Sequence, residues 1–273
     1  MNPTPLTQLS LFDKQMTKDE LMGKKNLYFN EIFNSQLHFY HRRFKLNYKL
    51  EYRSDDFILL RLANKKVVHI EKEFHRESFD SEPSCLVAIY NDPKIQQIAI
   101  ESDKTSFGTS FTVVRVIEKA FERELARLNL GININPKYEE KEFWDLLRKY
   151  EYQIQSIRFE FEYPNLSEIN KTLSDELKEA SKSLNSETTK IEFSAGDKKV
   201  LDNLVENNEE LSGLVKTSAA GGGPAKLKIK GLRRWESTDN KTKCFELDEL
   251  EVDASEERIV EYVREIKSQL KND

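Results

Sequence analysis

Cysteine and histidine are scarce in this sequence, which limits the metal and disulfide chemistry that it can carry. Only two cysteines occur in 273 residues, and Cys85 and Cys244 lack the paired spacing of a zinc site. We expect both to be buried thiols. No histidine has a helix-spaced His partner with an intervening Glu; the four histidines are His38, His41, His69 and His75. We therefore predict no metal site and no cofactor.

Long hydrophobic runs and a large net charge are also absent. The chain has no run of about 18 apolar residues and no basic start followed by an apolar centre, so we expect neither membrane insertion nor secretion. Charged residues make up 33% of the chain, yet the formal net charge is only −5. This balance gives no global basic excess for nucleic-acid binding and is typical of a cytoplasmic protein.

The familiar catalytic signatures are missing as well. The sequence has no Gly-x-Ser-x-Gly elbow, no His-Glu-x-x-His helix and no dinucleotide fingerprint. The glycine run in residues 219–224 lacks the Gly-Lys-Ser/Thr continuation of a phosphate loop, which favours a plain flexible connection. Asp55, Asp56 and Glu71 bracket predicted strands, but no Glu-x-Lys follows on the second strand, as two-metal chemistry would require. We predict no catalytic residues, and a nuclease-like enzyme with an unrecognised active site is the alternative.

The first half of the chain is rich in strand patterns. Alternating or continuous apolar residues predict an antiparallel meander over residues 46–52, 57–62 and 67–74. A hairpin is expected between 85–90 and 95–100, because Asn91, Asp92 and Pro93 supply turn chemistry between them. Apolar residues at three- and four-residue steps from Val114 to Leu128 then predict a helix that ends at Gly131.

Strands and helices alternate in the second half. We predict helices at 139–150, 166–184 and 208–216, strands at 157–163 and 189–195, and a final helix capped by Ser255. A basic strand in 225–235 and an acidic strand in 244–252 are expected to form a hairpin, with a β-bulge at Asp248 or Glu249 where the apolar phase switches. The fold class is therefore α+β, with a strand-rich antiparallel N-terminal half and an alternating C-terminal half. The expected divisions are a flexible tail at 1–20 and domains at 21–130 and 131–273.

A short apolar motif lies near the start of the chain. Residues 1–20 have the composition of a flexible terminus, yet they contain Gln8, Leu9, Ser10, Leu11 and Phe12 in succession. This run resembles the Gln-Leu-Ser/Asp-Leu-Phe peptide by which bacterial DNA polymerases, mismatch-repair proteins and initiation regulators dock on the replicative sliding clamp. The resemblance implies a DNA polymerase sliding clamp as partner. The alternative is that the apolar residues pack on this protein's own core or on a second copy.

A basic and aromatic segment lies between Lys24 and Arg53. Its basic residues outnumber its acidic ones, Glu31 and Glu51, and aromatic residues are interleaved throughout. Cations neutralise phosphates and exposed rings stack on unpaired bases, so the pattern predicts a nucleic-acid surface. The candidate residues are His41, Arg42, Arg43, Lys45, Lys49 and Arg53. The alternative is that most of the rings belong to the core.

The order of elements also carries a resemblance across about residues 80–200. A strand-rich start, the run Glu82-Pro-Ser-Cys-Leu-Val-Ala-Ile-Tyr90, a helix, and then alternating strands and helices are similar to the lambda-type RexA phage-exclusion proteins. That resemblance implies a cytoplasmic sensor that binds DNA and signals to an effector. Two hypotheses follow. In the first, the chain is a non-catalytic protein that is recruited to the clamp and regulates or senses DNA replication, for instance in phage defence, and it acts as a homo-oligomer or as an effector subunit. In the second, the chain is a nucleic-acid-processing enzyme.

Overall fold

The computed structural model describes residues 2–3, 23–34, 37–93, 96–128, 130–162, 183–184, 186, 188–197, 199–238 and 242–272. It confirms an α+β fold with mixed helices and antiparallel sheets and a strand-rich N-terminal half. After the short strand β1 (Asn2–Pro3), the chain divides into two units. Leu6–Asn133 and Phe245–Asp273 form the first, and Ile134–Cys244 lies in the second. The C-terminal segment that was expected in the second domain therefore belongs with the first.

An antiparallel sheet in the order β4-β5-β8-β9 organises the first unit. Its strands are β4 (Asn47–Arg53), β5 (Phe57–Ala63), β8 (Ser84–Asn91) and β9 (Gln96–Ile100). The predicted hairpin appears as β8 and β9, which pair in register from Val87 opposite Ile100 to Asn91 opposite Gln96. The expected meander, however, stops after β4 and β5. Residues 67–74 do not pair with β5, whose second neighbour is β8.

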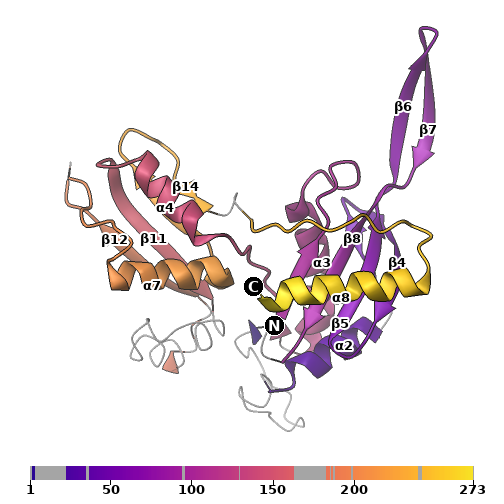
Figure 1. The fold of residues 1–273 in the computed structure, drawn as a ribbon, viewed down its shortest axis with the longest axis horizontal. Coiled ribbons are helices and arrows are strands. Elements are labelled where there is room, and N and C mark those ends of the chain that lie inside the picture. The colour runs from indigo at the N-terminus through magenta and orange to yellow at the C-terminus, as the bar shows by residue number, and fades with distance from the viewer. Residues whose placement is uncertain are drawn as a thin grey trace. The chain divides into compact units, whose positions relative to one another are not determined.

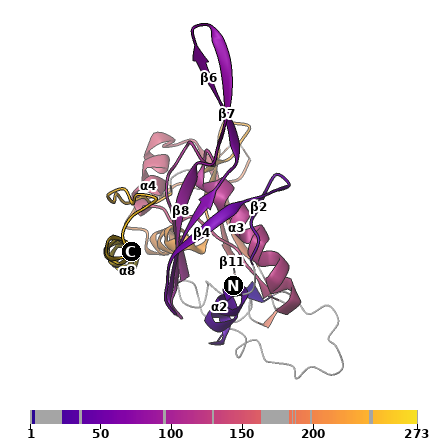
Figure 2. The same ribbon diagram turned by 90° about the vertical axis from the view of Figure 1, so that its right-hand side faces the viewer.

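Helices cover both faces of this sheet (Figures 1 and 2). Helix α8 (Glu256–Asn272) lies on one face, and helix α3 (Ser110–Leu125) lies on the other. Helix α2 (Lys25–Asn34) packs with α3, since the rings of Phe29 and Phe121 stack with centroids 4.6 Å apart. After α3 come the 3-10 turn η1 (Ala126–Leu128) and β10 (Leu130–Gly131). The sheet is therefore the middle layer of three.

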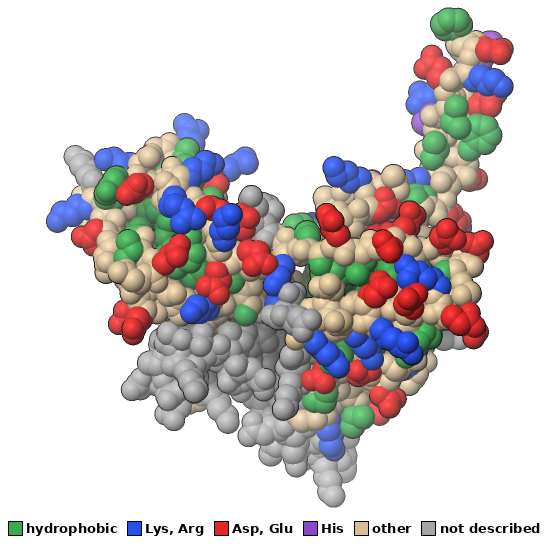
Figure 3. Space-filling view, in the orientation of Figure 1, with side chains coloured by type: hydrophobic (Ala, Val, Ile, Leu, Met, Phe, Trp, Pro, Cys, Tyr) green, Lys and Arg blue, Asp and Glu red, His purple; other side chains and the backbone are tan. Residues whose placement is uncertain are grey.

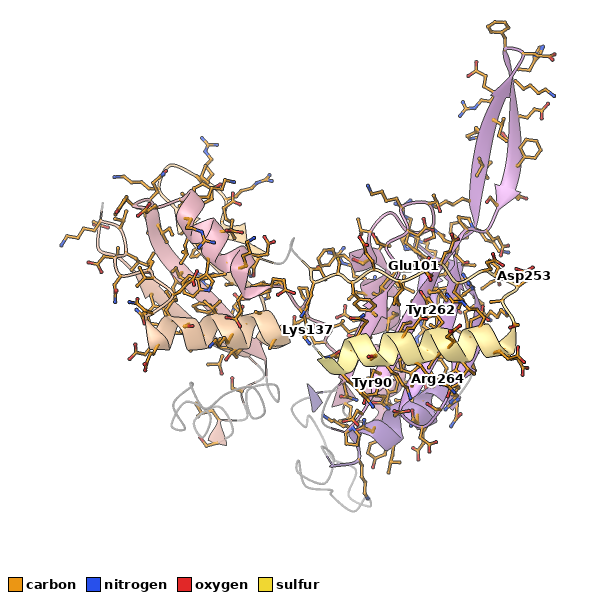
Figure 4. The ribbon with its side chains drawn as sticks, in the orientation of Figure 1. Tyr90, Glu101, Lys137, Asp253, Tyr262 and Arg264 are labelled. Carbon is orange, nitrogen blue, oxygen red and sulfur yellow. The ribbon has the colours of Figure 1, made fainter. Side chains whose placement is uncertain are left out.

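This layering explains why β5 is apolar at almost every position. Successive side chains of a strand point to opposite faces, and both faces of β5 are buried. Phe57 and Leu59 pack in the cluster that contains α8, together with Tyr90 and Tyr262. Figure 4 labels Tyr90 on β8 and Tyr262 on α8. Ser255 accepts a hydrogen bond from the Arg258 amide, as expected of a residue that caps α8.

The acidic segment before α8 is not a strand, so the predicted hairpin with 225–235 and its bulge are wrong. Residues 243–250 have no regular structure, and the segment packs on the first unit's sheet, where Leu250 is buried and Phe245 and Leu247 are partly buried. A non-repetitive path explains the phase switch without a bulge. Cys244 is exposed, contrary to expectation, whereas Cys85 is buried, and its burial raises the pKa of that thiol to about 12.

Two hairpins extend the first unit beyond its sheet. Strands β2 (Tyr40–His41) and β3 (Phe44–Lys45) form a short one. Strands β6 (Lys66–Lys72) and β7 (His75–Ser81) form a longer ribbon that projects from the unit in Figure 1. The prediction of β6 as a strand was correct, but its expected place in the meander was wrong, since it pairs with β7. A pattern of alternation does not specify which strand pairs with which.

The second unit is a four-stranded antiparallel sheet in the order β12-β11-β13-β14. Its strands are β11 (Ile154–Glu162), β12 (Thr188–Ser194), β13 (Ala225–Ile229) and β14 (Glu236–Ser237), and its helices are α4 (Glu140–Lys149) and α7 (Glu209–Thr217). Both helices contribute to one apolar core with the sheet, as the alternation in β11 predicted. That core includes Phe143, Trp144, Phe159, Phe161 and Val215.

The glycine run has a packing role in this unit. Residues Ser218–Gly222 form a π-type turn, η2, after α7. Gly223 has φ +130°, and a Cβ atom added there would lie 2.1 Å from the Glu160 carbonyl oxygen. The backbone therefore approaches β11 more closely than any side chain allows. This close contact accounts for the glycine at position 223.

Two sequence predictions lie outside the described residues. The peptide Gln8, Leu9, Ser10, Leu11 and Phe12 is one, and almost all of the helix expected at 166–184 is the other. None of the helices within the described ranges is long and apolar enough to cross a membrane.

Candidate nucleic-acid interface

The β2–β3 hairpin presents the centre of the predicted basic segment. Tyr40 pairs with Lys45 and His41 with Phe44, which leaves Arg42 and Arg43 as the two turn residues. Both have positive φ, 54° and 108°, as the tight turn of a two-residue hairpin requires. Arg42, Arg43, Phe44 and Lys45 are all exposed.

Helix α3 adds further positive charge beside this hairpin. The Arg123 guanidinium lies 5.6 Å from the centroid of the Tyr40 ring, which brings α3 against β2. Burial, together with the charges of Arg42, Lys66 and Lys119, lowers the pKa of His41. These three cations come from the β2–β3 turn, from β6 and from α3. The surface is therefore larger than the segment predicted from sequence.

The cations at the hairpin turn are available to a ligand. Within the described residues, the side chains of Arg42, Arg43 and Lys45 make no ion pair or hydrogen bond. The acidic residues on α3 are Glu118, Glu122 and Glu124, and Glu124 is paired with Arg127 at 2.7 Å. We call Arg42, Arg43, Phe44, Lys45, Lys119 and Arg123 the hairpin surface.

The aromatic residues of the segment divide between core and surface. Phe29, Phe33 and Phe39 are buried, as the core interpretation expected. Phe44 is 72% exposed and lies opposite His41, and Tyr40 is exposed opposite Lys45. A ring with a free face next to unpaired cations is the combination that stacks on a base while phosphates are neutralised. Only part of the interleaved pattern therefore belongs to a candidate interface.

Two of the six predicted binding residues lie apart from the hairpin surface. The Lys49 ammonium is 2.8 Å from the Glu51 carboxylate and donates to the Val252 carbonyl at 3.2 Å. The Arg53 guanidinium donates to the Asn30 carbonyl and lies over the Phe33 ring. Both side chains hold neighbouring parts of the first unit together. His41, Arg42, Arg43 and Lys45 are the four that the structure brings together.

Sequence reasoning missed the contribution of α3 and β6. Lys119 and Arg123 lie on the exposed side of an amphipathic helix, where charged residues are ordinary. Lys66 begins a strand and donates from its side chain to the Thr105 carbonyl at 2.5 Å. The available signal was the four-residue spacing of Lys119 and Arg123, which places them on one side of the helix. Nothing in that spacing indicates that the side faces a hairpin.

The second basic segment, in 225–235, is largely occupied by contacts within its own unit. Lys226 is 3.1 Å from the Glu160 carboxylate on β11, the strand that replaces the expected acidic partner. Lys228 donates to the carbonyls of Leu232 and Arg233, each at 3.0 Å. Arg158 lies over the Trp235 ring at 4.5 Å. Lys230, Arg233 and Arg234 are exposed at the turn between β13 and β14.

The carboxylates considered for two-metal chemistry do not form a site. Asp56 accepts hydrogen bonds from Lys267 and Ser54, and Glu71 lies on the β6–β7 ribbon opposite Arg76. Among the residues that the structure describes, no group of three or more His, Cys, Asp or Glu could hold a metal ion. The chemistry available at the hairpin surface is ionic contact, hydrogen-bond donation and stacking.

Comparison of the chain with protein-family models, with curated proteins and with solved structures finds no match. The function is therefore inferred from the chemistry of the residues themselves.

Proposed function

We propose that the chain is a non-catalytic protein that binds single-stranded nucleic acid through the hairpin surface. The observation that carries the proposal is the exposed ring of Phe44, next in sequence to Arg43 and Lys45, two exposed cations whose side chains make no ion pair or hydrogen bond within the described residues. A base stacks on the ring, while adjacent phosphates contact the cations. No base-edge reading is implied, so binding is tolerant of sequence.

The small number of cations sets the expected strength of this contact. Five or fewer phosphate contacts give weak binding that falls steeply with salt. The chain's net charge of −5 adds no attraction. A protein of this kind gains from a tether, because docking on a clamp that encircles DNA raises the effective concentration of DNA at the hairpin surface. We propose that Gln8, Leu9, Ser10, Leu11 and Phe12 provide that tether, and that the protein regulates or senses DNA replication there, including in defence against phage.

Fluorescence anisotropy with a labelled oligonucleotide tests the nucleic-acid contact. We expect the full chain to bind single-stranded DNA more tightly than duplex DNA of equal length, because stacking needs an unpaired base. Phe44→Ala should weaken single-strand binding by about 5- to 100-fold, which corresponds to one stacked base. The matched control is Tyr152→Ala, a highly exposed aromatic residue of the second unit, which should leave the affinity unchanged. Equal affinities of the wild type and the Phe44 variant would remove the proposal.

A separate measurement tests the tether. Binding of a purified bacterial sliding clamp to the full chain is compared with binding to a Leu11→Ala/Phe12→Ala variant. We expect micromolar binding that the double variant abolishes, because these two residues are the apolar anchors. Equal binding of both proteins, or no binding of either, would contradict clamp docking without affecting the hairpin surface. Incubation of labelled DNA with the protein and Mg²⁺ or Mn²⁺ tests the enzyme alternative, which reproducible cleavage would favour.

A further inference from the structure

The β6–β7 ribbon exposes large apolar side chains that no other described part of its unit buries. Phe74, at its tip, is 99% exposed, and Val67, Val68, Ile70 and Phe79 are exposed along its length. Figure 3 shows hydrophobic side chains along the ribbon and at its tip. Within the described residues, β6 and β7 form a two-stranded sheet of their own. An isolated hairpin of two strands is at best marginally stable in water, so the ribbon gains from a partner.

The apolar residues are concentrated on one face of the ribbon. Val68 lies opposite Phe79, and Ile70 lies opposite Glu77. Since alternate residues of a strand share a face, Val68, Ile70 and Phe79 form one apolar group. These three side chains are 42%, 51% and 47% exposed. On the opposite face Glu71 pairs with Arg76 and His69 with Ser78, which are polar, and Val67 is the one large apolar residue there, opposite Asp80.

The charges of the ribbon favour a protein partner over a polyanion. Acidic residues slightly outnumber lysine and arginine between positions 66 and 81, so phosphates gain little there. The free edge of β6 carries a lysine at each end, Lys66 and Lys72, and edge lysines oppose pairing with another strand. The free edge of β7 carries both signs, with Arg76 and Asp80 placed two residues on either side of Ser78.

We propose that the β7 edge pairs antiparallel with the β7 edge of a second copy of this chain, about a two-fold axis at Ser78. In that register Arg76 of each copy lies opposite Asp80 of the other, which forms two ion pairs across the axis. Pairing of two β6 edges about His69 instead places Lys66 opposite Lys72 twice, which is repulsive. Charge complementarity therefore selects β7 and a second copy as its occupant.

The same register joins the two apolar groups. Phe79 of one copy is a diagonal neighbour of Phe79 of the other, within reach of an aromatic side chain. The four-stranded sheet β6-β7-β7-β6 then has Val68, Ile70 and Phe79 of both copies on one face. Phe74 of each copy lies just beyond Ser81 of the other, at the base of the ribbon. This inference does not depend on the proposed nucleic-acid contact, which uses other residues.

Charge reversal with the full chain tests the pairing. Analytical ultracentrifugation of the wild type should show a dimer that dissociates on dilution, on the order of micromolar, because the interface is small. Arg76→Asp alone and Asp80→Arg alone should each weaken dimerisation at least tenfold, since like charges then face each other twice. An equimolar mixture of the two variants should recover a heterodimer, in which both pairs are again complementary. This recovery also shows that the variant ribbons are folded. A wild type that stays monomeric up to about 100 μM, or a mixture that stays monomeric, overturns the proposal.

Cysteine cross-linking tests the position of the axis. In a Cys244→Ser background, Ser78→Cys places two thiols directly opposite each other, at a separation that a disulfide spans. Oxidation should give a covalent dimer in high yield. The control Lys72→Cys is equally accessible but lies on the outer strand, so it should give little dimer. Equal yields from the two variants would contradict the Ser78 axis.

Discussion

Arg61 and Glu51 form a buried ion pair in the central sheet of the first unit. The Arg61 Nε lies 2.9 Å from the Glu51 carboxylate, and the two side chains are only 8% and 2% exposed. The register shifts at Glu51, which is the extra residue between Leu50 and Tyr52, so a bulge in β4 directs its carboxylate toward Arg61. Arg61 also donates through Nη2 to the carbonyls of Leu250 and Glu251. One guanidinium therefore holds the segment that precedes α8 on the sheet.

Removing this guanidinium should destabilise the first unit strongly. We expect Arg61→Ala to lower the free energy of unfolding by about 3 kcal/mol, because the buried Glu51 carboxylate then keeps only the Lys49 ammonium as a partner and the carbonyls of Leu250 and Glu251 lose their donor. Chemical denaturation followed by circular dichroism measures the change. Arg158→Ala, which breaks a half-exposed pair with Glu192 in the second unit, is the control and should cost about 0–1 kcal/mol. Similar destabilisation by both variants would contradict the structural role assigned to Arg61.

Lys49 and Arg53 should affect stability rather than nucleic-acid binding. Both were predicted as binding residues, but their side chains are held by Glu51, Val252, Asn30 and Phe33. We expect Lys49→Ala and Arg53→Ala to keep single-strand affinity within about twofold, whereas Arg43→Ala weakens it several-fold. Anisotropy titrations on all three variants at one salt concentration make the comparison. A larger decrease in affinity from Lys49→Ala than from Arg43→Ala would extend the interface along β4.

Binding through the hairpin surface should strengthen as the pH falls. In the free protein, burial and the charges of Arg42, Lys66 and Lys119 lower the pKa of His41 below 6.5. Bound phosphates offset those positive charges and raise the pKa of His41 in the complex. A group whose pKa rises on binding takes up protons, so affinity increases as pH falls through the pKa of the complex. Titration of the His41 ring protons by NMR, with and without oligonucleotide, should show the upward shift. An unchanged His41 pKa would separate that residue from the interface.

The pair between Asp56 and Lys267 should make the stability of the first unit depend on acid. Burial alone would raise the pKa of Asp56, but hydrogen bonds from Lys267 and Ser54 bring it below 3.8. Because the folded pKa is lowered, the stabilisation is complete above about pH 4 and is lost as pH falls through the folded pKa. Asp56→Asn should therefore be less stable than the wild type at pH 7, and the difference should narrow at pH 3. Denaturation midpoints of both proteins at pH 7 and pH 3 measure this difference in stability. A difference that is the same at both pH values would contradict the pairing of Asp56 with Lys267.

Patterns that depend on neighbouring residues could be predicted from the sequence. The continuous apolar run of β5 predicted a strand, and Ser255 with the spacing of Ile259, Val263 and Ile266 predicted α8. The β8–β9 hairpin followed from its turn residues. These features are encoded within a few residues of each other, which is why they were recoverable.

Pairings between distant residues could not be predicted in the same way. Alternation marked β6 as a strand but could not identify β7 as its partner. The sequence of the acidic segment 244–252 is equally consistent with a strand and with an irregular chain that packs on another sheet. Arg61 appeared only as a charge within an apolar strand. The candidate site shows the same division, because Arg42 and Arg43 were visible as a basic cluster, whereas Lys119 and Arg123 join it only through the contact of α3 with β2.

The most direct test of the proposed function is the salt dependence of single-strand binding by the full chain and two triple variants. Arg42→Ala/Arg43→Ala/Lys45→Ala removes the cations of the hairpin turn, and Lys230→Ala/Arg233→Ala/Arg234→Ala removes the same charge from an exposed turn of the second unit. We predict that the first variant lowers the slope of log K against log salt by about 2, at roughly 0.7 for each phosphate that the protein no longer neutralises, and that the second leaves it unchanged. Equal slopes for the wild type and the hairpin variant, or an equal reduction in both variants, would contradict the account.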